Sequence, residues 1–310
     1  MGTRAGIKVH PILTIVLALA VCSEAAYSRD NGQTLGSGPP KRADVTKPPT
    51  ARVQNKSEGK VSFKTLPHDV LHDQAFLWLR PFRLQSRDLP WAGAFLGTTT
   101  GLMFTDNNVA QKLAANPPGR GYDFSQTVTK LGTPLYASAI MGTVYLAGLA
   151  SKSKHAQATG ILGIRAVADS MIIVQSLKAI TQRPRPTLPG GVILNHNADG
   201  EFFAGGNSFP SGHAAGSFAL ATVVAQRNRN RPWVSVAAYS LAGLVSVPRI
   251  TERRHFPSDF FVGAVLGCLI GRHVAHSAEG RSPSVWNHLQ IDPYPTRGGG
   301  SGISVTWNFH

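Results

Sequence analysis

Six apolar segments of similar length constrain the fold of this chain more than any other feature of its sequence. They are separated by polar loops, and they lack the regular alternation of apolar and polar residues that a half-buried strand shows. Most are 15 to 19 residues long, near the lower limit for a helix that crosses a bilayer. The sequence therefore predicts an all-α fold, an antiparallel bundle of about six helices embedded in a membrane, from residues 90 to 104, 132 to 150, 156 to 178, 211 to 226, 232 to 248 and 257 to 275.

The regions outside the bundle have different compositions. Residues 1 to 26 contain two cations, an apolar run and the small residues SEAA, which predicts a signal peptide or, as the alternative, an uncleaved signal anchor. Residues 27 to 65 are polar and rich in Gly, Pro, Ser and Lys, as in a disordered linker. Residues 66 to 89 predict an amphipathic helix at the membrane interface, and the main domain then extends from 90 to 276.

Residues 277 to 310 are predicted to be a flexible tail. Its last residues alternate between apolar and polar side chains, so a strand is the alternative, but no partner strand is evident in the sequence. The predicted interface helix also carries four residues that suit either a metal site or a solvated polar face, His68, Asp69, His72 and Asp73. A solvated polar face is favoured over a metal site there, because no further ligand completes the set.

Two cations follow the third apolar segment at a fixed distance. Lys178 and Arg185 are separated by six residues, in the stretch KAITQRPRP. Pro184 and Pro186 prevent continuation of the helix and favour an extended backbone around Arg185. A cation that only closes a helix C-terminus would explain Lys178 but not this rigid extension. We therefore expect both cations to point at one spot.

The fourth segment begins with FPSGHAAG. Pro210 suits the first position of a helix, which would leave the N–H groups of Ser211, Gly212 and His213 unpaired at the positive end of the helix dipole. Such an end binds anions, and here it also carries an imidazole. Taken alone the motif is weak, because Pro-Ser-Gly is a common turn.

The fifth segment continues into PRITERRHFPSD at the start of the sixth. His255 and Asp259 are four residues apart, so the carboxylate can reach one ring nitrogen and leave the other exposed as a base or nucleophile. Arg249 adds a planar set of donors for oxygen anions. In an antiparallel bundle all three motifs lie at the same end, and together they predict a site for a phosphoryl group.

These motifs resemble the three-part signature of the type 2 phosphatidic acid phosphatases, the PAP2 superfamily, which also includes vanadium haloperoxidases. The signature is Lys, six residues, Arg-Pro; then Pro-Ser-Gly-His; then Ser-Arg, five residues, His, three residues, Asp. The spacing selects Arg185 rather than Arg183, and Pro248 replaces the usual Ser. The resemblance covers about residues 90 to 275.

The resemblance implies a role for each residue of the signature. His255 would form a phosphohistidine, Asp259 would orient it, and His213 would protonate the leaving alkoxide and then activate water. No metal or other cofactor is implied, although vanadate is a possible inhibitor. The phosphate oxygens would be bound by Lys178, Arg185, Ser211, Gly212 and Arg249.

The formal net charge of +15 is compatible with several anionic partners, and charge alone does not choose among them. We expect a membrane and a lipid or isoprenoid (pyro)phosphate substrate, with no nucleic acid and no obligate protein partner. The alternatives are an exported acid phosphatase for soluble monoesters, a vanadium-dependent haloperoxidase, and a non-catalytic protein that binds anionic lipids. Phe202, Phe203 and Phe209 lie close in sequence to the site and either contact substrate or pack the loop.

Basic residues in the loops opposite the three motifs place the site on the extracytoplasmic, periplasmic side of the cell membrane. A cleaved signal together with six crossings would instead place it inside. Five crossings, without residues 90 to 104, would remove this conflict, and so would a soluble periplasmic bundle. Arg165 and Asp169 within the third segment keep the soluble alternative open, although such a pair can also face the interior of a membrane bundle.

Overall fold

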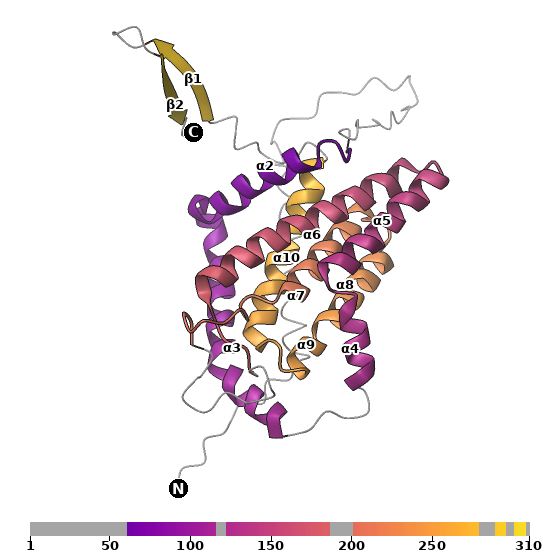
Figure 1. Cartoon of the computed structure of the whole chain (residues 1–310), viewed down its shortest axis with the longest axis vertical. Helices are drawn as coiled ribbons and strands as arrows, with labels where there is room; N and C mark the ends of the chain where they lie inside the picture. The colour runs from indigo at the N-terminus through magenta and orange to yellow at the C-terminus, as the bar shows by residue number, and fades with distance from the viewer. Residues whose placement is uncertain (1–60, 116–121, 187–200, 279–288, 296–300, 308–310) are drawn as a thin grey trace, which may run out of the picture.

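The computed structural model describes residues 61–115, 122–186, 201–278, 289–295 and 301–307. The predicted signal segment and nearly all of the predicted linker lie outside these residues. The described chain forms a helical bundle, which confirms the predicted all-α architecture (Figure 1). Its elements are α2 (Leu66–Leu79), the 3-10 turns η1 (Arg80–Arg83) and η2 (Ser86–Asp88), α3 (Leu89–Ala115), α4 (Tyr122–Lys130), α5 (Pro134–Ala150), α6 (Lys154–Thr181), α7 (Gly212–Arg227), α8 (Pro232–Ser246), α9 (Pro248–Thr251), α10 (Pro257–Ala278), β1 (Leu289–Pro295) and β2 (Ser301–Trp307).

The helix boundaries follow local sequence signals. Pro134 and Pro232 occupy the first helical positions of α5 and α8, where the missing N–H has no intrahelical partner to lose. Ser153 caps α6 by accepting a hydrogen bond from the Ala156 N–H. At its other end α6 stops at Gln182, which has a left-handed backbone with φ of 45°. The extended segment with the two prolines follows directly.

Helix α7 is the centre of the bundle. It packs against α6, α8 and α10, and most of its side chains are buried. Its small residues allow neighbouring helices to approach closely, while Phe218 fills the core against Phe260 of α10, with ring centroids 6.0 Å apart. Fully enclosed apolar side chains of this kind each stabilise the fold by about 1.5 to 3 kcal/mol.

Three glycines spaced four residues apart line the face of α10 that meets α7. A Cβ atom placed on Gly263, Gly267 or Gly271 would lie 2.5, 2.3 and 2.3 Å from the backbone oxygens of Ser211, Ala215 and Ala219. The two backbones are therefore in contact along this seam. Small residues at four-residue spacing are the usual means of such close packing in membrane helices.

The outer faces of several helices expose large apolar side chains. Leu135 and Leu146 on α5, Trp233 and Leu241 on α8, and Phe104 on α3 are all more than 60% exposed. Several charged residues are buried instead, among them Asp73, Asp106, Arg165 and Asp259, within a core that is mostly apolar. Within the described part of the chain, α6, the α8–α9 unit and α10 are long and apolar enough to cross a membrane, and α5 is a shorter apolar helix. Apolar outer faces together with buried, paired charges are typical of a membrane-embedded bundle.

Helix α2 differs from the prediction in two ways. It ends at Leu79, where Pro81 starts a 3-10 turn, so residues 66 to 89 are not one helix. The predicted solvated face is also wrong for Asp73, which is completely buried. Its carboxylate accepts bonds of 2.6 and 2.7 Å from Arg165 of α6 and lies 2.8 Å from Nε2 of His273.

This contact also corrects the pairing expected inside the third apolar segment. Arg165 binds Asp73 rather than Asp169, and the side chain of Asp169 accepts a bond of 2.9 Å from Gln74 instead. The long sequence separation between α2 and α6 hid both partners. The cluster ties α2 to α6 and α10 at the end of the bundle opposite the three motifs (Figure 1).

The end of the chain forms a hairpin, which corrects the prediction of a flexible tail. Strand β1 pairs antiparallel with β2, in a register that aligns Leu289 with Trp307 and Pro295 with Ser301. The sequence showed β2 by its alternation but concealed β1, because Pro293 and Pro295 are unusual within a strand. Prolines are compatible with an edge strand, and each strand of a two-stranded hairpin is an edge.

The glycine seam between α7 and α10 leads to a stability prediction. We expect Gly267→Val to lower the stability of the purified protein by about 1 to 3 kcal/mol, because the added atoms would enter the backbone of Ala215. Thermal unfolding in detergent would measure this change. Gly97→Val on α3 is the matched control, since a Cβ atom at Gly97 meets nothing within 4 Å. Equal melting temperatures for the two variants would contradict close packing at this seam.

Candidate active site

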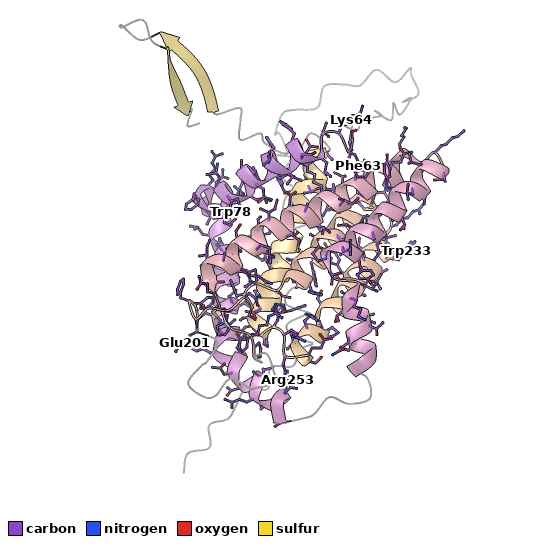
Figure 2. All side chains as sticks on the ribbon, in the orientation of Figure 1. Phe63, Lys64, Trp78, Glu201, Trp233 and Arg253 are labelled. Carbon is purple, nitrogen blue, oxygen red and sulfur yellow. The ribbon has the colours of Figure 1, made fainter. Side chains whose placement is uncertain are left out.

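The three sequence motifs meet at one end of the bundle. Helices α6 and α8 end there, α7 and α10 begin there, and α9 lies between α8 and α10 (Figure 1). Figure 2 shows Glu201 and Arg253 at this end and Phe63 and Lys64 at the other. The connectivity of the bundle therefore brings together residues that are up to 81 positions apart, as the sequence predicted.

His255 lies between α9 and α10 and is only 2% exposed. Its Nδ1 is 2.8 Å from the carbonyl oxygen of Ser208, so the Nδ1–H tautomer donates to that carbonyl. The Oδ2 atom of Asp259 is farther away, at 3.7 Å. The expected direct bond from Asp259 is thus replaced by the Ser208 carbonyl, which fixes the tautomer and leaves Nε2 with its lone pair.

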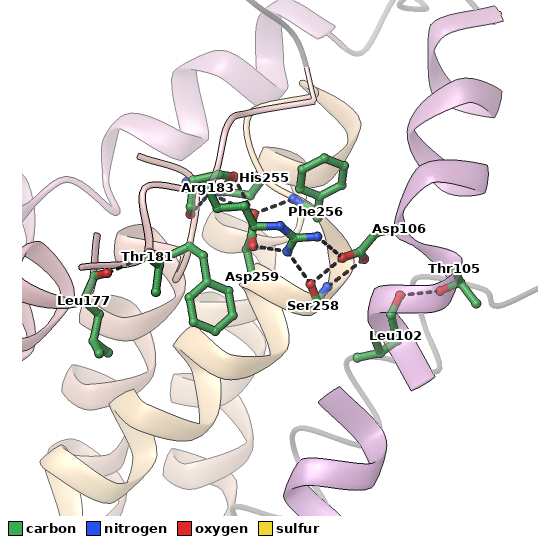
Figure 3. A network of polar contacts seen from close by, with 12 residues as sticks. Leu102, Thr105, Asp106, Leu177, Thr181, Arg183, His255, Phe256, Ser258 and Asp259 are labelled. Carbon is green, nitrogen blue, oxygen red and sulfur yellow. Dashed lines mark hydrogen bonds and ion pairs between the residues drawn. The ribbon is translucent and has the colours of Figure 1, made fainter. Parts of the chain in front are cut away.

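Asp259 is completely buried and accepts bonds on both carboxylate oxygens. Oδ1 accepts from Arg183 at 2.6 Å, and Oδ2 accepts from the Phe256 N–H at 2.9 Å and from the Ser208 hydroxyl (Figure 3). The carboxylate therefore acts on His255 mainly through Ser208 and the turn before α10. Buried carboxylates need such partners, because desolvation without them costs several kcal/mol.

The start of α7 differs by two residues from the prediction. Pro210 is not the first helical residue; Ser211 is the N-cap, and its hydroxyl accepts from the Ala214 N–H at 3.4 Å. The N–H of Ser211 is not unpaired either, because it donates to the carbonyl oxygen of Asp259 at 2.9 Å. The amides of Gly212 and His213, which the described residues leave without a backbone partner, are the ones at the positive end of the helix.

His213 faces the short turn between α4 and α5. A Cβ atom on Gly132 would lie 3.0 Å from Cδ2 of His213 and 2.4 Å from Val245, so only glycine fits at this close approach. Arg249, Lys178 and Arg185 lie near enough for their positive charges to act on His213. The N–H of Ser211, two residues before His213, donates to the carbonyl oxygen of Asp259, so the start of α7 lies against the start of α10.

The three predicted phosphate-binding cations come from different elements. Lys178 lies in the last turn of α6, with Nζ 4.0 Å from the Cβ position of Gly212. Arg185 donates through Nε to Asn207 at 2.9 Å. Arg249 of α9 donates to Glu252 at 2.7 Å, and Glu252 also accepts from Ser125 and Thr129 of α4. Arg185 and Arg249 are thereby each directed by a hydrogen-bond partner.

These cations are close enough to oppose one another. Burial lowers the pKa of Arg185, and the charges of Arg249 and Arg254 lower it further. A cluster of like charges at a helix N-terminus is stabilised by an anion with several oxygens. No group of three or more His, Cys, Asp or Glu side chains suited to a metal ion occurs among the described residues. The arrangement fits an oxyanion.

The structure separates the two arginines that the sequence had to choose between. Arg185 is half-buried near Lys178 and Arg249, and its role as the phosphate-binding arginine stays a prediction. Arg183 is 2% exposed and binds Asp106, Ser258 and Asp259. Arg183 therefore holds other residues of the site in place and does not line the site surface.

The three phenylalanines of the preceding loop divide between the two expected roles. Phe202 and Phe209 pack edge to face, with ring centroids 5.3 Å apart, and Phe202 also lies 5.3 Å from the Arg183 guanidinium. These two rings hold the loop onto the bundle. Phe203 is 75% exposed and has a left-handed backbone with φ of 67°, so its side chain is available on the surface.

Several supporting residues have no counterpart in the sequence reasoning. Their partners lie outside the three motifs, and spacing along the chain does not show such contacts. Asn207, Ser208 and Glu252 lie directly beside the motifs in the sequence, which was the available signal for them, whereas Asp106 had none. The residues are Asp106, Asn207, Ser208 and Glu252, together with the supporting role of Arg183.

The bond between Arg185 and Asn207 gives the site a direct test. We expect Asn207→Ala to weaken binding of inorganic phosphate about 3- to 10-fold, because one neutral-to-charged hydrogen bond no longer directs the guanidinium. Isothermal calorimetry on the detergent-solubilised protein would measure it. Asn228→Ala, at the opposite end of α7, is the control and should bind phosphate like the wild type. Unchanged affinity in Asn207→Ala would exclude this role for Asn207.

Comparisons with known proteins agree with the motifs. Residues 159–282 match the model of the PAP2 superfamily. The chain is 46% identical over 66 residues to the lipid A 1-phosphatase of Porphyromonas gingivalis, a match that spans 21% of this chain and only 15% of that relative. It is 28% identical over 146 residues to the undecaprenyl-diphosphatase BcrC of Bacillus subtilis, across 46% of this chain and 68% of the relative.

A solved structure shows a further similarity. The crystal structure of a transmembrane PAP2-type phosphatidylglycerolphosphate phosphatase from Bacillus subtilis is similar to this chain, with 17% sequence identity and a TM-score of 0.45. The similarity covers 70% of this chain and 98% of that chain. The family match includes all three motifs, from Lys178 through Asp259. Residues 159–282 are therefore similar to the PAP2 superfamily.

Proposed function

We propose that this protein is a membrane phosphatase that hydrolyses a lipid or isoprenoid (pyro)phosphate without a metal ion, through a phosphohistidine on His255. One observation carries the proposal. The Nδ1–H of His255 is held by the Ser208 carbonyl at 2.8 Å, so Nε2 is a lone-pair nucleophile in a site surrounded by Lys178, Arg185 and Arg249. Binding of an anion alone requires only the cations.

The proposed reaction has two displacements. Nε2 of His255 attacks phosphorus, the bond to the ester oxygen breaks, and His213 gives its proton to the departing alkoxide. A water molecule then gives a proton to His213 and attacks the phosphohistidine, which breaks the P–N bond and releases inorganic phosphate. The cations and the amides of Gly212 and His213 stabilise the charge on the equatorial oxygens in both steps.

The surroundings of His255 support a substrate with an apolar part. A shallow hollow beside the ring encloses essentially no free volume and is lined mainly by apolar side chains, three of them from α3 and one from α9. The relatives named above act on lipid A and undecaprenyl diphosphate, which are a lipid and an isoprenoid phosphate. The residues around the hollow are Val109, Ala110, Leu113, Pro186, Ile250, Arg253, Phe256 and Pro257.

The proposed orientation places the site on the extracytoplasmic side. At the opposite end of the bundle, Arg227 approaches His155 at 3.3 Å and Arg229 approaches His276 at 2.8 Å. The basic loops after α5 and α7 therefore share that end, together with the C-terminus of α10. The positive-inside tendency assigns this end to the cytoplasm.

The proposal predicts the activity of a single variant. Full-length wild type in detergent should release phosphate from phosphatidic acid or an isoprenyl diphosphate faster than from a soluble monoester, with chelator present. His255→Ala should reduce kcat by about a thousandfold or more, because no other group replaces the nucleophile. Equal release by the two proteins would contradict the assignment of His255 as the nucleophile. Halide oxidation that depends on added vanadate would favour the haloperoxidase alternative.

The two histidines predict a bell-shaped pH profile. Burial lowers the pKa of His255 below its ordinary value of 6.5, although Asp259 opposes this effect. The neutral form attacks, so the rate should fall as pH decreases through this lowered pKa, in a range below about 6.5. Burial and the charge of Arg249 lower the pKa of His213 to about 3 in the free site, and we expect a bound phosphate anion to raise it. His213 must be protonated to release the alkoxide, so kcat should also fall at high pH. The limbs report the coupled pair. A profile that rises steadily from pH 4 to 9, with chemistry rate-limiting, would contradict these roles.

A further inference from the structure

A buried ionic network connects α3 to the catalytic end of α10. Arg183 donates from Nη1 to Asp259 at 2.6 Å and to the Ser258 hydroxyl at 2.7 Å, and from Nη2 to Asp106 of α3 at 2.7 Å (Figure 3). Asp106 also accepts from the Ser258 N–H at 3.1 Å and from its hydroxyl. Asp106, Arg183, Ser258 and Asp259 are each at most 2% exposed, so water does not screen these charges.

Arg183 is held in one orientation by more than its ionic partners. Its guanidinium lies 4.3 Å from the centroid of the Phe256 ring and 5.3 Å from that of Phe202. The two rings flank a planar cation that has separate acceptors for its two terminal nitrogens. A lysine could not serve these acceptors together, because its ammonium is a single point charge.

Two short routes lead from Arg183 to the imidazole of His255. Along the first, Arg183 holds Asp259, whose other oxygen holds the Ser208 hydroxyl. Along the second, the backbone carbonyl of Arg183 accepts from the Ser208 N–H at 2.8 Å. Ser208 is the residue whose carbonyl receives the Nδ1–H of His255. Arg183 thus fixes Ser208 from both sides.

We propose that Arg183 and Asp106 are positioning residues for His255: they set the orientation and charge state of the imidazole through Asp259 and Ser208, without contacting the phosphate. The inference rests on the proposed role of His255 as the nucleophile. Asp106 lies outside residues 159–282, so the family match does not include it. Helix α3 would then contribute to catalysis by supplying a counter-charge.

The charge balance gives the two residues opposite effects on His255. Arg183 opposes the stabilisation of imidazolium by Asp259, and Asp106 partly offsets Arg183. Removal of the arginine charge should therefore favour protonated His255, and removal of the Asp106 charge should favour the neutral form. The other charged or titratable groups acting on His255 come from every surrounding element: Lys178 from α6, Arg185 from the segment after it, His213 from α7, Arg249 from α9 and Asp259 from α10.

The test compares Arg183→Gln with Asp106→Asn in the full-length protein. We expect Arg183→Gln to move the acid limb of the kcat profile up by about one pH unit and to lower kcat about 10- to 100-fold, with KM changed less than about threefold. Burial raises the pKa of Asp106 to about 6, so its charge is only partly present in the acid limb. Asp106→Asn should therefore move the limb down by at most about half a unit, because the amide still accepts from Arg183 but carries no charge. Arg183→Lys should restore the limb but only part of kcat.

Asp73→Asn is the matched control. It removes another buried carboxylate that binds an arginine through two hydrogen bonds, at the opposite end of the bundle. It should lower the melting temperature and leave the acid limb where it is in the wild type. Any loss of activity that arises only from weaker folding would appear in this control as well.

A second readout needs no turnover: the pKa of His255 in each variant, measured by NMR on histidine-labelled protein. The His255→Gln variant assigns the NMR signal of His255. Shifts of opposite sign for Arg183→Gln and Asp106→Asn would support the inference even if the wild type released no phosphate, a result that would remove only the proposed function. Shifts of the same sign, or no shift in Asp106→Asn, would overturn it. If Arg183→Gln does not fold, Asp106→Asn and Arg183→Lys decide the matter.

Discussion

Asp259 is the acceptor on which the three motifs depend. Its side chain binds Arg183 from the first motif and Ser208 just before the second, while its main-chain carbonyl receives the N–H of Ser211. The first turn of α10 therefore holds the end of α6 and the beginning of α7 in one place. A buried carboxylate keeps its charge only where such partners surround it, so the geometry of the catalytic end and the ionisation of one side chain depend on each other.

Buried polar contacts hold together a bundle whose outer faces are apolar. Two buried ionic clusters lie at opposite ends of the bundle, one at Asp259 and the other where Asp73 meets Arg165 and His273. Between them α7 and α10 meet through small residues and backbone contact, and Phe218 packs against Phe260 in the core. In lipid, where burial of apolar surface gives little force between helices, these polar contacts and the close seam hold the bundle together.

The sequence predicted the bundle and the gathering of the motifs because both depend on local patterns. Hydrophobic segment length gave the helices, and the fixed gaps around Lys178, His213 and His255 gave one catalytic end. The partner of a given side chain depends on packing between distant helices, and this could not be predicted. Asp73 looked like a surface residue on α2, and Asp106 had no distinguishing neighbour on α3. The tail hairpin was missed for a local reason, since prolines in β1 conceal a strand.

Helix α3 lies outside the family match and still supplies a residue that supports the site. The residues that define the family fall within 159–282, yet the carboxylate that faces Arg183 comes from a helix encoded more than fifty positions earlier. A designer who grafted only the signature onto another helical scaffold would transfer a guanidinium with half of its neutralising environment missing. The smallest portable version of this site is consequently a set of four chain segments rather than three.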